Sequence, residues 1–259
     1  MKKIFLITLV FISAEFISQL NTPKYSNEFL NIGVGARSLA MSNSVITSTQ
    51  GAMSGYWNPA NLSNTKNDIQ IGLMHAEYFA GIAKYDFGSI VKKIDDKSSF
   101  GFSFLRFGVD NIPNTTDLID AQGNLNYDRI TYFSAADMAF IGSYGKKISD
   151  YLSFGGSVKI INRTAGDFAQ AWGFGLDLST TYQKNNWGFA IVARDVTSTF
   201  NVWNYQLTDE MINVFNTTGN ELPQNGLELT LPRIILGINK KYQLEENVSL
   251  LLEFNSDLT

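Results

Sequence analysis

The residue types that usually carry catalysis or bind metals are scarce in this sequence. It contains a single histidine, His75, and no cysteine. Thiolate nucleophiles, Cys-based zinc sites, paired histidines and His-containing metal clusters are therefore excluded. A Ser or Asp site built around His75 stays open, although no G-x-S-x-G motif supports it. We expect a surface or interfacial histidine, and no catalytic residue, metal site or cofactor.

Single charged residues recur on strand-like segments, on the face opposite the bulky apolar side chains. Charges that face lipid are costly, whereas charges in the lumen of a membrane barrel can pair with one another. We interpret five residues as such lumen charges: Asp137, Lys159, Asp177, Arg194 and Glu253. A polar ladder that stabilises the barrel is one interpretation, and a route for a substrate is the other.

The segments that carry these charges alternate apolar with small or polar residues, which is the period-two pattern of β-strands. Residues 151–163 and 171–182 show it clearly, and a turn at 184–186 joins the second segment to 187–194 in a hairpin. Further copies lie at 69–73, 82–94, 100–104, 138–144, 231–242 and 248–254, which gives about nine strands. The small residues opposite the apolar ones favour a transmembrane antiparallel β-barrel over a soluble β-sandwich.

Two long polar connections interrupt the strands, at 110–135 and at 197–228. We predict that both are outer loops, because membrane barrels have short turns at one end and long loops at the other. Within the second, the spacing of Met211, Ile212, Val214 and Phe215 after Asp209 predicts a short amphipathic helix.

The N-terminal part of the chain differs from the strands. Met1-Lys2-Lys3 and the apolar run from Ile4 to Ala14 are typical of a signal peptide, which we place at residues 1–20. Residues 21–66 are rich in Gly, Ala and Ser, which permit close approach of backbones. Irregular backbone is tolerated inside a barrel, so we predict a hatch or plug at 21–66 and the barrel at 67–259.

The composition agrees with an exported membrane protein and excludes a nucleic-acid partner. Charged residues make up 17% of the chain, below the roughly 25% usual for soluble domains. The net charge is −4 and no cluster of basic residues is present, so the electrostatic footprint of nucleic-acid binding is missing.

Several segments resemble one family of outer-membrane proteins. They are NIGVGARSLAM at 31–41, YWNPANL at 56–62, FLRFGVDNIP at 104–113, GGSVKII at 155–161 and AWGFGLD at 171–177. These segments, in this order, resemble the PorV/PorQ family, which is related to the fatty-acid transporter FadL. The resemblance covers nearly the whole chain after the signal peptide.

The resemblance implies a FadL-like barrel of about fourteen strands with the N-terminal segment inserted as a hatch. Because only about nine strands are recognised and the chain stops in polar residues, we expect it to be incomplete at the C-terminus. Within the hatch, the resemblance points to five candidates for ligand contact or packing: Gly35, Arg37, Trp57, Asn58 and Pro59. Pro59 fixes φ and Asn58 can cap the backbone, which predicts a turn there. Trp172 and Trp187 are interpreted as membrane-interface aromatics.

The function that the resemblance implies is an accessory role in type IX protein secretion at the bacterial outer membrane. Expected partners are outer-membrane lipid, the type IX translocon and exported cargo proteins. The alternative is FadL-like transport of long-chain fatty acids or other hydrophobic small molecules across the outer membrane.

Overall fold

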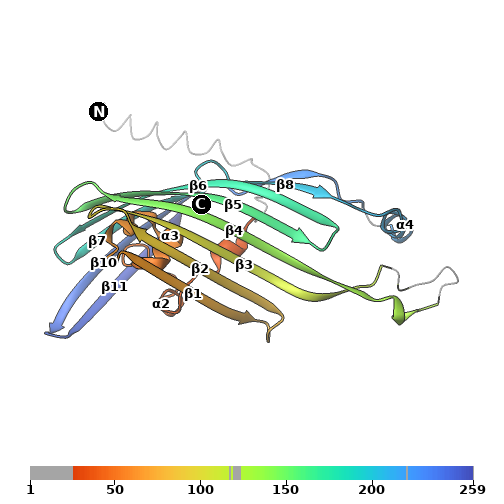
Figure 1. The fold of residues 1–259 in the computed structure, drawn as a ribbon, viewed down its shortest axis with the longest axis horizontal. Helices are drawn as coiled ribbons and strands as arrows, with labels where there is room; N and C mark the ends of the chain where they lie inside the picture. The colour runs from red at the N-terminus through yellow and green to blue at the C-terminus, as the bar shows by residue number, and fades with distance from the viewer. Residues whose placement is uncertain (1–25, 117, 119–123, 220, 259) are drawn as a thin grey trace, which may run out of the picture.

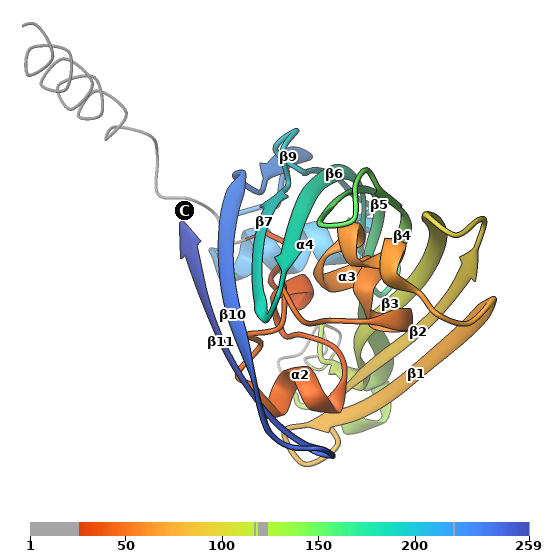
Figure 2. The ribbon, with the colours of Figure 1, turned by 90° about the vertical axis from the view of Figure 1, so that its left-hand side faces the viewer.

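The structure, a computed structural model, describes residues 26–116, 118, 124–219 and 221–258. The predicted signal peptide at 1–20 and the first residues of the predicted hatch lie outside the described residues. Within the described residues, eleven strands form a single strongly curved antiparallel sheet, which Figures 1 and 2 show from two directions. The predicted all-β, antiparallel class is therefore confirmed.

The strands follow one another around the sheet almost in chain order. They are β1 (Ile69–Tyr78), β2 (Ala83–Lys93), β3 (Ser98–Asn114), β4 (Thr131–Lys147), β5 (Leu152–Ala165), β6 (Ala169–Lys184), β7 (Trp187–Arg194), β8 (Phe200–Tyr205), β9 (Gly226–Leu229), β10 (Arg233–Glu245) and β11 (Val248–Leu258). The order runs from β1 to β7 and continues with β10 and β11, while β8 pairs with β6 and β9 pairs with β8. Among the described strands, β1 and β11 end this order without pairing with each other, so the sheet is not closed.

The predicted count of about nine strands is wrong, because β8 and β9 lie within the connection predicted at 197–228. β7 pairs with Leu178–Lys184 of β6, and β8 pairs with Ala169–Phe174 at the other end of the same strand. The two short strands thus extend the sheet beyond the point where β7 ends. A strand of 4 residues such as β9 is too short to show a period-two pattern in the sequence.

The connection predicted at 110–135 is shorter than expected, because β3 continues to Asn114 and β4 begins at Thr131. The register shifts between Val109 and Ile112, and Asn111 between them has a φ of 58°. Such a β-bulge inserts one unpaired residue and breaks the alternation of faces. The sequence pattern therefore ended at the bulge, although the strand did not.

The helix predicted in the second connection is confirmed as α4 (Asp209–Thr218). The side chain of Thr208 accepts a hydrogen bond from the N–H of Met211 and caps the start of the helix. Gly219, with a φ of 71°, ends it in the left-handed conformation. Figure 1 shows α4 beyond the strand ends, at the end of the sheet where β3 ends and β4 begins.

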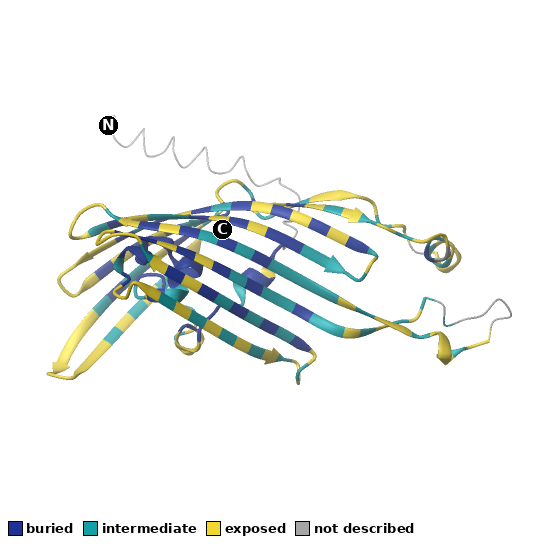
Figure 3. Cartoon of the chain, viewed as in Figure 1, coloured by how far each residue is buried: buried dark blue, intermediate teal, exposed yellow. Residues whose placement is uncertain are grey.

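The outer face of the sheet is apolar and exposed, and the inner face is buried, which produces the alternating bands along the strands in Figure 3. Leu73 is 80% exposed, Phe254 is 66% exposed and Trp172 is 54% exposed. These side chains recur on neighbouring strands, where for example Ile160 lies opposite Phe174. Water-soluble monomers rarely expose apolar patches of this extent, whereas the lipid-facing side of a barrel requires them.

The concave face of the sheet is covered by residues 26–66, which we call the inner segment (Figure 2). It contains η2 (Glu28–Asn31), α2 (Ala36–Ala40), η3 (Gly51–Met53), α3 (Ser54–Trp57) and η4 (Pro59–Asn64). The buried hydrophobic cluster joins Tyr56 and Trp57 of this segment to Tyr85, Leu105 and Ile161 of the strands. Of the helices in the described part of the chain, none is both long and apolar enough to cross a membrane.

Candidate functional site

Asn58 occupies the middle of the inner segment and is completely buried. Its Nδ2 donates to the carbonyl of Ile46 at 2.7 Å and to Thr181 Oγ1 of β6 at 2.8 Å. Its Oδ1 accepts the N–H of Ala60 at 3.0 Å, which caps η4 directly after Pro59. A buried amide with both ends bonded fixes the backbone around it. In this structure Asn58 and Pro59 therefore hold the inner segment against the sheet.

Two glycines on the inner face make room for the same turn. A Cβ atom on Gly145 of β4 would lie 2.3 Å from the carbonyl oxygen of Pro59. On Gly155 of β5, it would lie 2.3 Å from the backbone nitrogen of Ala60. Both distances are far inside van der Waals contact with backbone atoms, so only glycine fits at either position. Gly145 and Gly155 thus allow the backbone of the inner segment to pack directly against β4 and β5.

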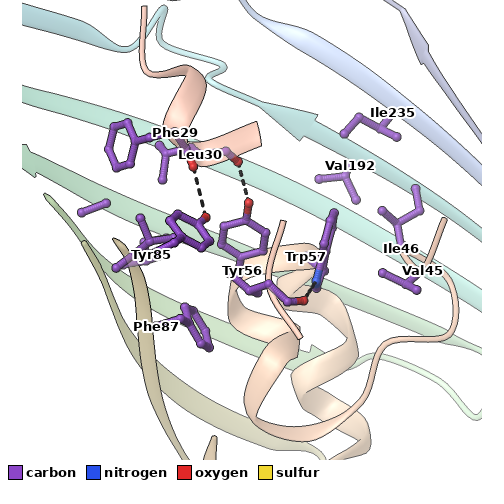
Figure 4. Packing of buried hydrophobic residues seen from close by; sticks show 14 of the residues in the cluster. Phe29, Leu30, Val45, Ile46, Tyr56, Trp57, Tyr85, Phe87, Val192 and Ile235 are labelled. Carbon is purple, nitrogen blue, oxygen red and sulfur yellow. Dashed lines mark hydrogen bonds between the residues drawn. The ribbon is translucent and has the colours of Figure 1, made fainter. Parts of the chain in front are cut away.

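Tyr56 and Trp57 directly precede this turn and belong to the buried hydrophobic cluster (Figure 4). The Tyr56 hydroxyl donates to the carbonyl of Leu30 at 2.6 Å, and Trp57 Nε1 donates to the carbonyl of Val34 at 2.9 Å. Burial raises the pKa of the Tyr56 phenol, although the nearby Arg194 guanidinium opposes the shift. Tyr56 therefore stays protonated and acts as a donor.

Lys159 and Asp177, two of the predicted lumen charges, meet in the interior. Lys159 Nζ lies 2.8 Å from Asp177 Oδ1 and also forms an ion pair with Asp195. Asp177 accepts the backbone N–H of Asp195 at 2.9 Å, and Asp195 accepts the hydroxyl of Thr199 at 2.6 Å. A buried ion pair is tolerated when further hydrogen bonds satisfy its lone pairs, as they do here.

Asp195 was not among the predicted site residues. It follows the last residue of β7 and has a φ of 55°, which departs from the extended backbone of the strand. Its side chain consequently leaves the alternation and turns toward Lys159. The available signal was an acidic residue next to Arg194 at the end of a predicted strand, but its direction does not follow from a period-two pattern.

Arg194, the third predicted charge in this region, is also buried. Its NH2 donates to the carbonyl of Tyr56 at 3.3 Å. Its guanidinium carbon lies 5.4 Å from the centroid of the Tyr56 ring and 5.7 Å from that of Trp57, which is cation–π geometry. A cavity of only about 20 Å³ remains between Arg194, Lys159 and Asn27.

The two remaining predicted charges lie elsewhere. Asp137 binds Arg163, with 2.8 Å between Oδ1 and Nε, and Arg163 also binds Glu228 at 3.1 Å. Glu253 Oε1 of β11 accepts the backbone N–H of Thr47 in the inner segment at 2.8 Å. The five predicted charges thus occupy three separate places on the inner face. Arg163 lies directly opposite Asp137 on the neighbouring strand β4, so their pairing could have been expected from a hairpin. Glu228 was missed because it lies on β9, a strand that the sequence pattern did not reveal.

The start of the inner segment is held by β8, which the sequence pattern did not reveal, by Thr230 between β9 and β10, and by the first residue of β10. Asn201 Nδ2 donates to Asn27 Oδ1 at 3.0 Å, and Asn27 Nδ2 donates to Thr230 Oγ1 at 2.9 Å. Arg233 donates to Asn31 Oδ1 at 2.5 Å. These contacts connect the inner segment with the region around β8 and β9.

Gly35 and Arg37 lie apart from Asn58 and Pro59, at the end of the sheet with the short turns. They line a cavity of about 670 Å³, here called the end cavity, between the inner segment, the β6–β7 turn, β10 and β11. Its lining includes Arg37, Thr49, Gln50, Asn186, Lys241 and Ser249. The NH2 group of Arg37 donates to Ser48 Oγ at 3.0 Å. The structure therefore divides the five hatch candidates between a buried turn and an open cavity.

His75 lies on the outer face of β1, and its side chain is 55% exposed. Its Nδ1 is 2.6 Å from Asp86 Oδ1, and its Nε2 is 3.6 Å from Glu77 Oε1. Within the described residues, no group of three or more His, Cys, Asp or Glu side chains is arranged to hold a metal ion.

Residues 18–216 match the protein family described as type IX secretion system protein PorV. No curated protein matches the chain. Among solved structures, it is similar to a TodX deltaS2S3 mutant described as a monoaromatic hydrocarbon channel, with 14% sequence identity and a TM-score of 0.37. That similarity covers 87% of this chain and 83% of the other. Because the family match spans most of the sequence, this protein belongs to the PorV family.

Proposed function

We propose that this protein resides in the outer membrane and serves type IX secretion by binding exported cargo or the translocon. Membership of the PorV family supports the secretion role. The observation that carries the membrane location is the outer face of the sheet, with side chains such as Leu73 and Phe254 exposed on successive strands. Such a face is stable in lipid and prone to association in water.

We propose that the inner segment acts as the hatch and keeps the interior closed. The ring pair Tyr56 and Trp57 and the ion pairs of Lys159 occupy the centre of the concave face. The cavity beside them, about 20 Å³, offers room for about one water molecule. This packing supports a role in binding proteins, without catalysis, over passage of a bulky solute.

The orientation follows from the connections. Short turns at 94–97, 148–151 and 185–186 lie at one end of the sheet, and α4 lies at the other, where β3 ends and β4 begins (Figure 1). Bacterial barrels direct short turns to the periplasm and long loops outward. We therefore assign α4, β8 and β9 to the outer side, where protein partners are met.

The second candidate function is FadL-like transport of long-chain fatty acids or other hydrophobic small molecules. It requires an apolar passage past the inner segment, opened by hatch movement. The end cavity gives it one supporting observation, because it lies beside Gly35 and Arg37 and has apolar walls at Met53, Trp187 and Leu251. Two cationic side chains, Arg37 and Lys241, also line it.

Deletion of the gene tests the two functions together. Secretion of a C-terminally tagged exported protein and uptake of a long-chain fatty acid are measured in the deletion strain and in the strain complemented with this chain. We expect lost secretion with normal uptake, restored by complementation. Normal secretion with lost uptake would overturn the secretion role in favour of transport.

A further inference from the structure

The end cavity carries positive charge that the described residues leave unpaired. Arg37 and Lys241 both line it, both are exposed, and no Asp or Glu belongs to its lining. Within the described parts of the chain, neither cation forms an ion pair, although other Lys and Arg side chains form eight. An anionic ligand would therefore find charge that is not already neutralised.

Both cations are held at the cavity by neighbouring structure. Arg37 is fixed in α2 and donates to Ser48, as described above. Lys241 lies on β10, and its backbone N–H donates to the carbonyl of Asn186 in the β6–β7 turn at 2.8 Å. The two positive groups thus come from opposite walls, the inner segment and the sheet.

The nearest acidic residue on the wall formed by β11 does not cancel this charge within the cavity. Glu253 follows Ser249 and Leu251 on the inner face of that strand but is not part of the lining. Its Oε1 is already occupied by the backbone N–H of Thr47 at 2.8 Å. The carboxylate is therefore directed to the inner segment.

The remaining lining can form hydrogen bonds with a peptide backbone. It contains side-chain amides and hydroxyls that can bond peptide groups: Gln50, Gln183, Asn185, Asn186, Ser48 and Ser249. Met53, Trp187 and Leu251 add apolar walls, against which the side chains of a peptide can pack. The volume of about 670 Å³ lies within the range of about 300–1,000 Å³ usual for binding sites.

We propose that the end cavity binds an acidic peptide segment of a periplasmic protein, with Arg37 and Lys241 as its two charge contacts. The periplasmic source rests on the proposed function, which places the short-turn end on that side of the outer membrane. The chemistry of the ligand rests on the cavity alone. The inference therefore adds a second contact surface, at the end opposite α4.

The test uses the full chain in detergent and a fluorescein-labelled peptide of alternating Glu and Ser, with a Lys-Ser peptide of equal length for comparison. Fluorescence anisotropy measures binding of each. We expect the acidic peptide to bind, the basic one not to bind, and affinity to fall as salt rises. Equal binding of the two peptides would overturn the proposal.

Substitutions locate the site. R37Q and K241Q should each weaken binding of the acidic peptide about two- to fivefold, and the double variant about tenfold, as expected for exposed ion pairs. K146Q is the matched control, because Lys146 is an exposed lysine on β4 near the same end, and it should bind like the wild type. Binding that is unchanged in the double variant would contradict the assignment to this cavity.

A competitor distinguishes a peptide from other anions. An oligogalacturonate of the same charge and laurate are added to the bound acidic peptide. We expect both to compete more weakly than the unlabelled acidic peptide does. If either displaced the labelled peptide at a lower concentration than the unlabelled peptide requires, a peptide site would be refuted. The secretion assay in cells is independent of these measurements, so failure of the proposed function and failure of this inference give different results.

Discussion

Two polar regions of the protein contain similar residue types but differ in burial and in hydrogen bonding. In the interior centre, around Asn58, Lys159 and Asp177, the side chains are buried and bonded to one another. In the end cavity, Arg37 and Lys241 are exposed and have no ion-pair partner in the described part of the chain. The contrast shows that a charged residue on the inner face can be structural or available for binding, depending on whether it has an ion-pair partner. Substitutions in the centre should lower stability, and substitutions in the end cavity should lower binding.

The largest effect is expected for Lys159→Met. The change leaves Asp177 and Asp195 buried without their shared cation, which should cost about 3–5 kcal/mol of stability. The temperature at which the folded band is lost in heat-modifiability gels measures it. The control is Lys146→Met on the exposed face of β4, which should behave like the wild type. An unchanged transition in Lys159→Met would show that the ion pairs do not stabilise the interior.

Gly155→Ala should cause the second largest loss of stability. Its Cβ would lie 2.3 Å from two backbone atoms of Pro59 and Ala60, so the inner segment must shift, at about 1–3 kcal/mol for overpacking. The matched control is Gly142→Ala on β4, where the nearest heavy atom to the added Cβ is Phe100 Cζ at 3.9 Å. Urea unfolding of both variants measures the difference. Equal stabilities of Gly155→Ala and Gly142→Ala would mean that the turn does not pack against Gly155.

Asn58→Ala should cost about 1–2 kcal/mol, because it leaves buried partners such as the Ile46 carbonyl without their hydrogen bonds. Asn186→Ala, an exposed amide in the lining of the end cavity, is the comparison and should change urea unfolding little. If Asn186→Ala lowered the free energy of unfolding more than Asn58→Ala, the end cavity and not the interior centre would carry the structural residues.

The smallest effect on stability is expected for Arg37→Gln and Lys241→Gln. Both side chains are exposed, so each substitution should change the free energy of unfolding by less than about 0.5 kcal/mol. The same urea experiment measures this, alongside the loss of acidic-peptide binding. Unfolding at clearly lower urea in either variant would make these residues structural and remove the basis of the comparison.

The long regular strands could be predicted because their two faces meet different surroundings. In β5, β6 and β7 the side chains alternate between the apolar outer surface and the inner segment, and the sequence alternates with them. Such a pattern needs several residues on each face, so β8 and β9 were missed. It also needs an unbroken register, so the part of β3 beyond the bulge at Asn111 was missed.

The candidate site was predictable only in part for a related reason. Alternation placed Lys159 and Asp177 on the same face, and their strands are neighbours in sequence, so their proximity could be expected. The strand partner of Asn58, Thr181, and the inner-segment partner of Glu253, Thr47, lie more than a hundred residues away along the chain. Their contacts depend on how the inner segment crosses the sheet, which a pattern within one strand does not encode.

If the inner segment keeps the interior closed, its middle should stay in place while the protein functions. Because the chain has no cysteine, the pair Ser63→Cys and Ser153→Cys can lock it; the two hydroxyl oxygens are 2.8 Å apart. Secretion is measured in cells that carry the oxidised double variant, with each single variant as a control. We predict normal secretion with the crosslink formed. Loss of secretion in the oxidised double variant, restored by reduction, would show that the inner segment must move and would contradict the account.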